Sequence, residues 1–193
     1  VMAAFPIHYC GSIGYYQSLL QADHVRFEIH EHFVKQTHRN RVEIMGPNGV
    51  QKLVIPTRKT GHKRVMHEVE ISYTENWQRE HWKSLEAAYR KSPFFEHYEP
   101  FIARFYSTKT ESLVEHNIDL FNVIFGLLGL KVNYSFTEAY ESDVSIDHRA
   151  SKFTIQDPKP YLQVFSDRFD FIPNLSILDA LFCLGPETKH LLK

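Results

Sequence analysis

The sequence of 193 residues predicts a single α/β domain, with a mixed β-sheet, a β-hairpin insertion and surrounding helices. Three observations support this class. Hydrophobic residues make up 43% of the chain and charged residues 23%, which is near the globular average and sufficient for one core. Segments with strand-like alternation are interleaved with segments of helical spacing. No repeat, low-complexity tract or domain boundary interrupts residues 1–193, so we expect one domain.

The opening of the chain predicts a strand, a short helix and a second strand. Residues 3–9 are largely apolar, and Gly11 ends this stretch. Ser12 can cap a helix whose apolar residues follow helical spacing. Residues 24–30 alternate between apolar and polar side chains, as a half-buried strand does. This order is similar to a βαβ unit with a brief crossover, and the polar residues 31–40 follow it as an irregular segment.

A β-hairpin is predicted next. Residues 41–45 and 51–55 flank the sequence Gly-Pro-Asn-Gly at 46–49, and an Asn-Gly pair between two strands is a strong hairpin indicator. Pro56 ends the second strand. The basic residues 57–64, which include a glycine, predict a mobile loop.

The rest of the chain predicts mostly helices. Apolar side chains recur at helical spacing over residues 110–128, and Gly129 can end that helix. In the tail, Ser176 and Asp179 fit a capping box, and we expect them to be capping and helix-surface residues. The other predicted elements are a strand at 69–73, a helix from Asn76 to Lys91, helix restarts at Pro93 and Pro100, a strand at 132–136, a loop at 141–160, a strand at 161–165 and a helix at 176–184.

The net charge of −1 is unevenly distributed. Residues 1–68 contain nine Lys or Arg and five Asp or Glu, whereas residues 69–193 contain 13 and 18. A basic front half favours an anionic ligand such as a phosphate or pyrophosphate. Binding of RNA or single-stranded nucleic acid ranks last, because such proteins usually have a stronger basic bias.

Location is predicted from the apolar runs and the cysteines. The longest apolar stretch, residues 118–130, is shorter than the roughly 20 residues of a bilayer span, so we expect no membrane insertion. Cys10 and Cys183 have neither disulfide nor metal spacing, which favours a reducing cytoplasm. The first residues lack the basic region of a signal peptide. We interpret Cys10 as buried and inert rather than as a nucleophile.

Several segments resemble the WbqC-like family of bacterial proteins. The clearest is residues 32–41, His-Phe-Val-Lys-Gln-Thr-His-Arg-Asn-Arg, which is similar to the family's KQxxRNR signature. The other similar segments are Tyr15–Gln17, Leu53–Pro56, Asn76–Trp82, Ser92–Phe95 and Phe171–Asp179. The chain departs from the family pattern at Cys10, where an aromatic residue is expected. The resemblance implies a role in surface-polysaccharide synthesis, and a glycine transferase acting on an amino sugar has been suggested for a member.

The candidate binding residues lie in this signature. Lys35, Arg39 and Arg41 provide three cations, and Gln36 and Asn40 provide two amides. A guanidinium can hold a phosphate with two hydrogen bonds, and a lysine adds a point charge. These residues therefore fit a nucleotide-sugar pyrophosphate. The alternative is that the last two cap strand ends while the lysine is solvated.

Histidine and aromatic candidates complete the predicted site. His81 lies on the apolar face of its helix, and the ordinary histidine pKa of about 6.5 suits a general base. The alternative is a hydrogen-bonded histidine at the core edge. Tyr15 could stack on a base or sugar, or belong to the core. His30 and His32 would share one face of a strand, but no third ligand is identifiable, so we assign no metal.

From these residues and the resemblance, we expect an acyl or aminoacyl (glycine-type) transferase acting on a nucleotide-linked amino sugar in bacterial O-antigen-like biosynthesis. The alternative is a non-catalytic binding or scaffold protein of the same pathway. The sequence leaves open whether the chain is catalytic, which cofactor or donor it uses, and its oligomeric state. No P-loop, Rossmann glycine fingerprint, Gly-x-Ser-x-Gly elbow or zinc-protease motif is present, which disfavours ATPases, dinucleotide oxidoreductases and standard serine hydrolases.

Overall fold

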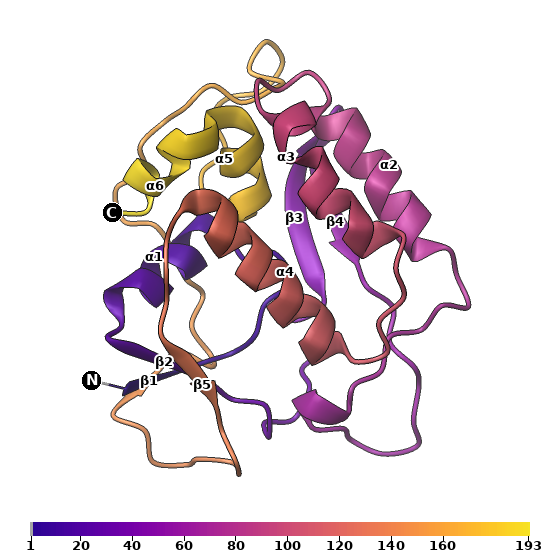
Figure 1. The fold of residues 1–193 in the computed structure, drawn as a ribbon, viewed down its shortest axis with the longest axis vertical. Helices are drawn as coiled ribbons and strands as arrows, with labels where there is room; N and C mark the ends of the chain where they lie inside the picture. Colours follow the sequence, from indigo (N-terminus) through magenta and orange to yellow (C-terminus); the bar gives the residue numbers. More distant parts are fainter. Residues whose placement is uncertain (1) are drawn as a thin grey trace.

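A four-stranded parallel sheet pairs the start of the chain with strands from residues 134–147 (Figure 1). The computed structural model describes residues 2–193. β1 (Met2–Phe5) lies between β2 (His24–Phe27) and β6 (Ile146–Asp147), and β5 (Tyr134–Phe136) pairs with β2. The strand order is β5-β2-β1-β6, and every pair is parallel. The carboxyl ends of all these strands therefore meet at one edge of the sheet.

The predicted strand-helix-strand opening is confirmed. α1 (Ile13–Gln21) joins β1 to β2, and its cap Ser12 accepts a hydrogen bond from the backbone N–H of Tyr15. The first strand is shorter than predicted, because the chain leaves the sheet after β1. There the backbone N–H of Tyr9 donates to the carbonyl of His38 at 2.8 Å instead of to a sheet neighbour. This departure turns the residues after β1 toward the polar segment 31–40.

The predicted hairpin is also confirmed. β3 (Arg41–Gly46) and β4 (Gly49–Val54) pair antiparallel and form a separate two-stranded sheet, so the α/β fold has two sheets and not one mixed sheet. Pro47 and Asn48 occupy the centre of the turn, and Gly49 takes the positive φ of 111° that a residue with a side chain rarely adopts.

Helices cover the sheets, with α4 (Leu113–Leu128) running across the middle of the molecule (Figure 1). Its predicted end at Gly129 is confirmed, with a left-handed φ of 64°, whereas the helix begins three residues later than predicted, after Ser112, which accepts a hydrogen bond from the N–H of Glu115. The remaining elements are η1 (Met66–Glu68), α2 (Trp77–Tyr89), α3 (Phe95–Ile102), η2 (Ala103–Tyr106), α5 (Ile177–Leu184), η3 (Gly185–Glu187) and α6 (Thr188–Leu191).

Three predicted segments differ from the structure. The predicted loop at 141–160 contains β6, which is only two residues long and gains its order from pairing with β1. Residues 69–73 form isolated bridges to Thr57 and Ser112 rather than a strand. Residues 161–165 have no regular structure, and the side chains of Tyr161 and Gln163 instead bind one buried carboxylate.

That carboxylate is Asp179, which we expected at a helix surface and which is fully buried. Its side chain accepts hydrogen bonds from the hydroxyls of Tyr89 at 2.9 Å and Tyr161 at 2.5 Å, and from the amide of Gln163 at 3.0 Å. Ser176 caps α5 as predicted, accepting from the N–H of Leu178. The prediction for Asp179 was wrong because its three partners lie outside the local sequence.

The aromatic richness of the chain is explained by packing between the sheet and the helices. Phe121 of α4 contacts Phe27 with ring centroids 5.4 Å apart and Tyr134 at 5.7 Å, while Phe125 stacks on Tyr16 at 5.2 Å. Cys10 is buried, and burial raises the pKa of its thiol, so the interpretation as an inert cysteine is supported. Across residues 2–193, no helix combines the length and apolarity that a membrane crossing requires.

A glycine contact ties α1 to the chain that follows β6, and it gives the first testable prediction. A Cβ added at Gly14 would lie 2.1 Å from the carbonyl oxygen of Phe153. We expect Gly14→Ala to lower the free energy of unfolding by about 1–3 kcal/mol, the usual cost of overpacking. Gly126→Ala is the matched control, because its Cβ would meet nothing within 4 Å inside α4, where alanine is favoured by up to about 1 kcal/mol. Chemical denaturation of both variants checks the prediction, and equal stability would contradict it.

Candidate anion-binding site

An open pocket of about 740 Å³ lies at the carboxyl edge of the parallel sheet, and we call it the edge pocket. His8 comes from the chain after β1, Glu31 from the chain after β2 and Arg149 from the chain after β6, while Ser12 caps α1. Ligands of open α/β sheets bind outside the carboxyl ends of the strands. The volume also falls within the roughly 300–1,000 Å³ of small-molecule sites.

The edge pocket carries more positive than negative charge. Its cationic side chains are Arg39, Arg41, Arg149 and Lys152, and its carboxylates are Glu31 and Asp147. Two histidines, His8 and His38, add imidazoles to the wall. An excess of cations in a concave site attracts an anionic ligand.

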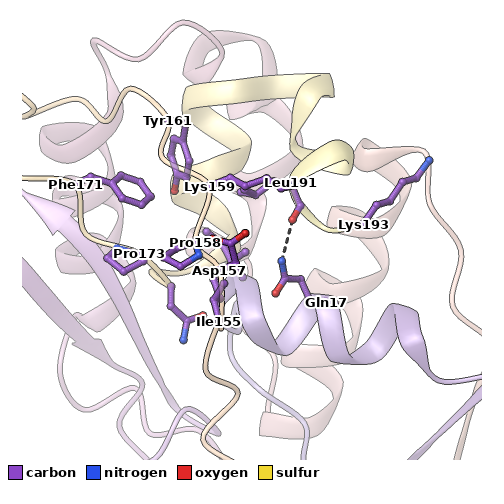
Figure 2. A pocket seen from close by; sticks show the side chains of 12 residues that line it. Gln17, Ile155, Asp157, Pro158, Lys159, Tyr161, Phe171, Pro173, Leu191 and Lys193 are labelled. Atoms are coloured by element: carbon purple, nitrogen blue, oxygen red, sulfur yellow. Dashed lines mark hydrogen bonds between the residues drawn. The ribbon is translucent and has the colours of Figure 1, made fainter.

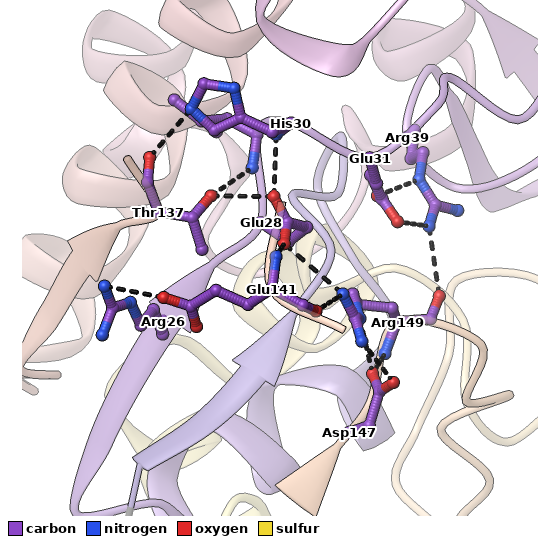
Figure 3. Close-up of polar contacts among 10 residues, drawn as sticks. Arg26, Glu28, His30, Glu31, Arg39, Thr137, Glu141, Asp147 and Arg149 are labelled. Atoms are coloured by element: carbon purple, nitrogen blue, oxygen red, sulfur yellow. Dashed lines mark hydrogen bonds and ion pairs between the residues drawn. The ribbon is translucent and has the colours of Figure 1, made fainter. Parts of the chain in front are cut away.

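Arg149 is the most tightly held of these cations (Figure 3). It donates to both oxygens of Asp147, at 2.8 and 2.7 Å, and to the carbonyl of Glu141 at 2.6 Å. It also lies 3.4 Å from the buried Glu28, whose carboxylate accepts from the hydroxyl of Thr137 at 2.8 Å. These contacts raise the pKa of the guanidinium and fix the loop after β6 against β2 and β5.

Arg39, a predicted phosphate ligand, is already paired. Its Nε and Nη2 atoms donate to the two carboxylate oxygens of Glu31 at 2.7 and 3.0 Å, and Nη2 also donates to the carbonyl of Arg149 at 3.1 Å. Both side chains are buried. The fork of Arg39 therefore serves a buried ion pair that joins the 31–40 segment to the loop after β6 (Figure 3).

Arg41 and Lys152 are the cations of the edge pocket that remain available. Within residues 2–193, neither forms an ion pair, and Arg41 Nε is buried without a hydrogen-bond partner. An unpaired buried N–H costs about 1–3 kcal/mol unless something satisfies it. A phosphate oxygen bound in the pocket is an acceptor of the kind that the Nε–H of Arg41 lacks.

His8 is the edge-pocket residue with the most unusual environment. Its ring stacks on Tyr15 with centroids 4.2 Å apart, and its buried Nδ1 atom has no hydrogen-bond partner among the described residues. Burial, then the neighbouring His38 and Arg39, lower the pKa of His8 well below the ordinary value. The imidazole is therefore neutral at pH 7, and without a bound anion it is a weak base.

The structure puts two other predicted residues in the core. His81 is 4% exposed, lines none of the described pockets, and bonds through one ring nitrogen to the hydroxyl of Tyr9 and through the other to the carbonyl of Val54. This geometry favours the alternative of a structural histidine. Tyr15 is buried, and its hydroxyl donates to the carbonyl of Pro6 at 2.7 Å. Its ring packs against the ring of His8 and is not exposed for stacking on a ligand.

The other signature residues divide between two pockets. Gln36 is exposed and lines the edge pocket beside Arg41. Lys35 and Asn40 line a different pocket, and the amide of Asn40 also donates to the carbonyl of Ile55 at 2.9 Å. The predicted cluster is therefore contiguous in sequence but does not form a single binding surface.

A small cavity and the histidines at 30 and 32 lie away from the edge pocket. A cavity between α1, the 155–173 segment and the C-terminal residues (Figure 2) encloses about 170 Å³, which is below the usual range for ligands. For metals, no group of three or more His, Cys, Asp or Glu side chains within residues 2–193 is arranged to hold an ion. His30 bonds to the carbonyl of Thr137, and its ring packs on His67 at 4.7 Å.

Sequence reasoning missed His8, Arg149 and Lys152. The histidine lies near the carboxyl end of the predicted strand 3–9, so the rule that ligands bind at strand carboxyl ends could have identified it. Arg149 and Lys152 lie in a segment predicted as loop, and no local pattern indicates that β6 returns them to β1.

A comparison with protein families gives one match. The sequence profile described as the WbqC-like protein family matches residues 8–156, which include the chain from the start of the edge pocket to the loop after β6. No curated protein and no solved structure matches the chain.

Proposed function

The chain belongs to the WbqC-like protein family, whose membership suggests a role related to polysaccharide biosynthesis, and from this premise we propose that it is an acyl or aminoacyl transferase that acts on a nucleotide-linked amino sugar at the edge pocket. The observation that carries the proposal is the combination of unpaired cations with a neutral histidine in one pocket. A cytoplasmic location remains part of the proposal, supported by two buried free cysteines.

In this proposal the pyrophosphate lies against Arg41 and Lys152. Arg41 offers an unsatisfied Nε–H, and Lys152 is exposed at the pocket rim. Arg39 and Arg149 shape the wall through their carboxylate partners and contribute charge at a distance. Gln36 is available to hydrogen-bond a sugar or ribose hydroxyl, because its amide is exposed at the same pocket.

His8 takes the role that the sequence suggested for His81. The free amine of the sugar attacks the carbonyl carbon of an activated acyl donor, a C–N bond forms, and the bond from that carbon to the donor's leaving group breaks. One amine proton passes to the neutral His8. A phosphate bound nearby raises the pKa of His8 toward the working pH, because an opposite charge favours the protonated form.

Ligand-dependent thermal stability tests the anion site. We expect UDP- and dTDP-linked amino sugars to raise the melting temperature of the native protein by mass action. Arg41→Ala should weaken that binding roughly 10- to 100-fold, the cost of one lost hydrogen bond to a charged group. Arg79→Ala, an exposed arginine of α2 that lines none of the described pockets, is the matched control and should bind as the wild type does.

The assay uses Arg41 and not Arg39, because removing Arg39 would leave the buried carboxylate of Glu31 unpaired and destabilise the fold. Equal binding by wild type and Arg41→Ala would contradict the anion site. Binding that is lost in Arg41→Ala, but without transfer from acyl-thioester or aminoacyl-adenylate donors, would favour the non-catalytic binding protein.

A further inference from the structure

A second basic pocket lies between the end of β4 and the loop of residues 57–64, and we call it the loop pocket. Its volume is about 650 Å³. The basic side chains that line it are Lys35, Lys59, His62, Lys63 and Arg64. No described Asp or Glu lines the loop pocket, whereas the edge pocket contains two carboxylates. The same pocket has an apolar wall, which is formed by Phe33, Val54, Ile55 and Pro56.

Arg64 holds the two ends of this loop together. Its guanidinium donates to the carbonyl of Arg58 and to the hydroxyl of Thr57, and it lies over the ring of Phe33 with 5.4 Å to the centroid. The backbone N–H of Phe33 in turn donates to the carbonyl of Arg64 at 2.9 Å. The buried Arg64 thus acts as a clamp, and Lys59 and Lys63, which lie between the clamped ends, line the pocket.

The lysines of the loop pocket lack partners. In the part of the chain that the structure describes, Lys35, Lys59 and Lys63 form no ion pair. All three are exposed. Several like charges around one concavity repel one another, and a bound polyanion removes that repulsion.

The loop pocket and the edge pocket share a wall. In the segment 34–41, Lys35 and Asn40 line the loop pocket, whereas Gln36 and Arg41 line the edge pocket. Adjacent residues therefore face different pockets, separated by one peptide unit of about 3.8 Å between Cα atoms. A ligand in one pocket is in a position to change the placement of side chains in the other.

We propose that the loop pocket binds a second small ligand that carries a chain of two or more phosphates, of the kind found in nucleoside triphosphates and in nucleotide carriers of acyl groups. The lysines and Arg64 contact the phosphates, and the apolar wall at Phe33 and Pro56 receives an uncharged part of the ligand. This site does not depend on the amino-sugar proposal. An extended nucleic acid fits less well, because the cations gather in one pocket and the net charge of the chain is −1.

Calorimetric titration with tripolyphosphate, ATP and coenzyme A tests the proposal. We expect at least one of these probes to bind, with an affinity that decreases as salt increases. The double variant Lys59→Ala/Lys63→Ala should weaken it by roughly tenfold or more, since two charge contacts are lost. Lys83→Ala/Lys91→Ala removes the same charge from exposed positions that line none of the described pockets, and should bind as the wild type does. The three probes distinguish recognition of phosphate alone from recognition of a nucleotide.

Arg41→Ala separates this site from the edge pocket. We expect it to keep the tripolyphosphate, ATP or coenzyme A binding that Lys59→Ala/Lys63→Ala loses, whichever way the amino-sugar experiment turns out. The proposal is overturned if none of the three probes binds, if both lysine pairs weaken binding equally, or if Arg41→Ala abolishes it. It is also overturned if single-stranded oligonucleotides bind more tightly than all three probes and gain affinity with length.

Discussion

The free energy of unfolding is expected to fall by several kcal/mol as the pH is lowered from 6.5 to 4, because three histidines are buried in their neutral form. Burial lowers the pKa of His81 to about 4 and lowers the pKa values of His8 and His116 as well. An unfolded histidine titrates near 6.5, so in this pH interval the unfolded chain binds more protons than the native protein. Stability is therefore present above pH 6.5 and is lost as the pH falls toward 4.

His81 alone accounts for about 3 kcal/mol of this loss, since a difference of one pKa unit corresponds to about 1.4 kcal/mol. The core around it explains why its charged form is unfavourable. Its ring lies against Trp77 and Tyr9, and the buried His116 lies close enough to oppose a second positive charge. Because the carbonyl of Val54 only accepts, the neutral ring carries its proton on Nε2, and protonation would place a second proton on Nδ1, which faces the hydroxyl of Tyr9.

Urea denaturation of wild type and His81→Gln between pH 4 and 7 measures the effect. The slope of unfolding free energy against pH should be smaller in the variant by up to one proton, which is about 1.4 kcal/mol per pH unit. Glu31 and Asp179 act in the opposite direction, because burial raises their carboxyl pKa values and the native state takes up their protons first. They are present in both proteins, so the difference isolates His81. Identical slopes would show that His81 does not titrate differently in the two states.

Removing the carboxylate of Asp179 should be the most destabilising single change in the tail. Asp179→Ala leaves the hydroxyls of Tyr89 and Tyr161 and the amide of Gln163 without their acceptor. An unsatisfied buried donor costs about 1–3 kcal/mol, so we expect a loss of about 3–5 kcal/mol. In a chain of this size, the melting temperature should fall by roughly 10 °C or more.

Two further variants separate the hydrogen bonds from the charge. Asp179→Asn keeps one acceptor oxygen and should lie between wild type and Asp179→Ala. Asp119→Ala removes an exposed carboxylate from α4 and should change stability by less than about 0.5 kcal/mol. Scanning calorimetry gives all three values. A loss below about 1 kcal/mol in Asp179→Ala would show that water or other acceptors replace the carboxylate.

The elements that the sequence predicted correctly are those whose information is local. The hairpin has its turn residues between its two strands, and α4 has a serine cap at one end and Gly129 at the other. The two-residue β6 has no such pattern, because its order comes from pairing with β1 about 140 residues earlier. Asp179 was misplaced for the same reason. The capping pattern depends on residues next to it in the sequence, whereas its burial depends on Tyr89 and Tyr161, which are distant in the sequence.

The candidate site was predicted in part for the same reason. The signature segment does line basic pockets. Arg41 is still proposed as a ligand of the pyrophosphate, as the sequence indicated. Burial could not be foreseen for Arg39, since its partner Glu31 becomes a neighbour only through the fold, whereas burial of Tyr15 in the core was one of the two alternatives that the sequence offered. His8 and Arg149 likewise come to line the same pocket only when β1 and β6 pair.

One contact near the edge pocket determines how short a folding fragment of this chain could be. Asn174, with a left-handed φ of 61°, accepts from the backbone N–H of Gly14 and donates to the carbonyl of Phe153, both at 2.8 Å. The family match ends at residue 156, before this asparagine and before α5. A fragment trimmed to the matched region would lose the brace between α1 and the pocket wall, together with the acceptor for Tyr89. The smallest autonomous unit therefore extends through α5, and boundaries for expression or domain grafting belong beyond Leu184.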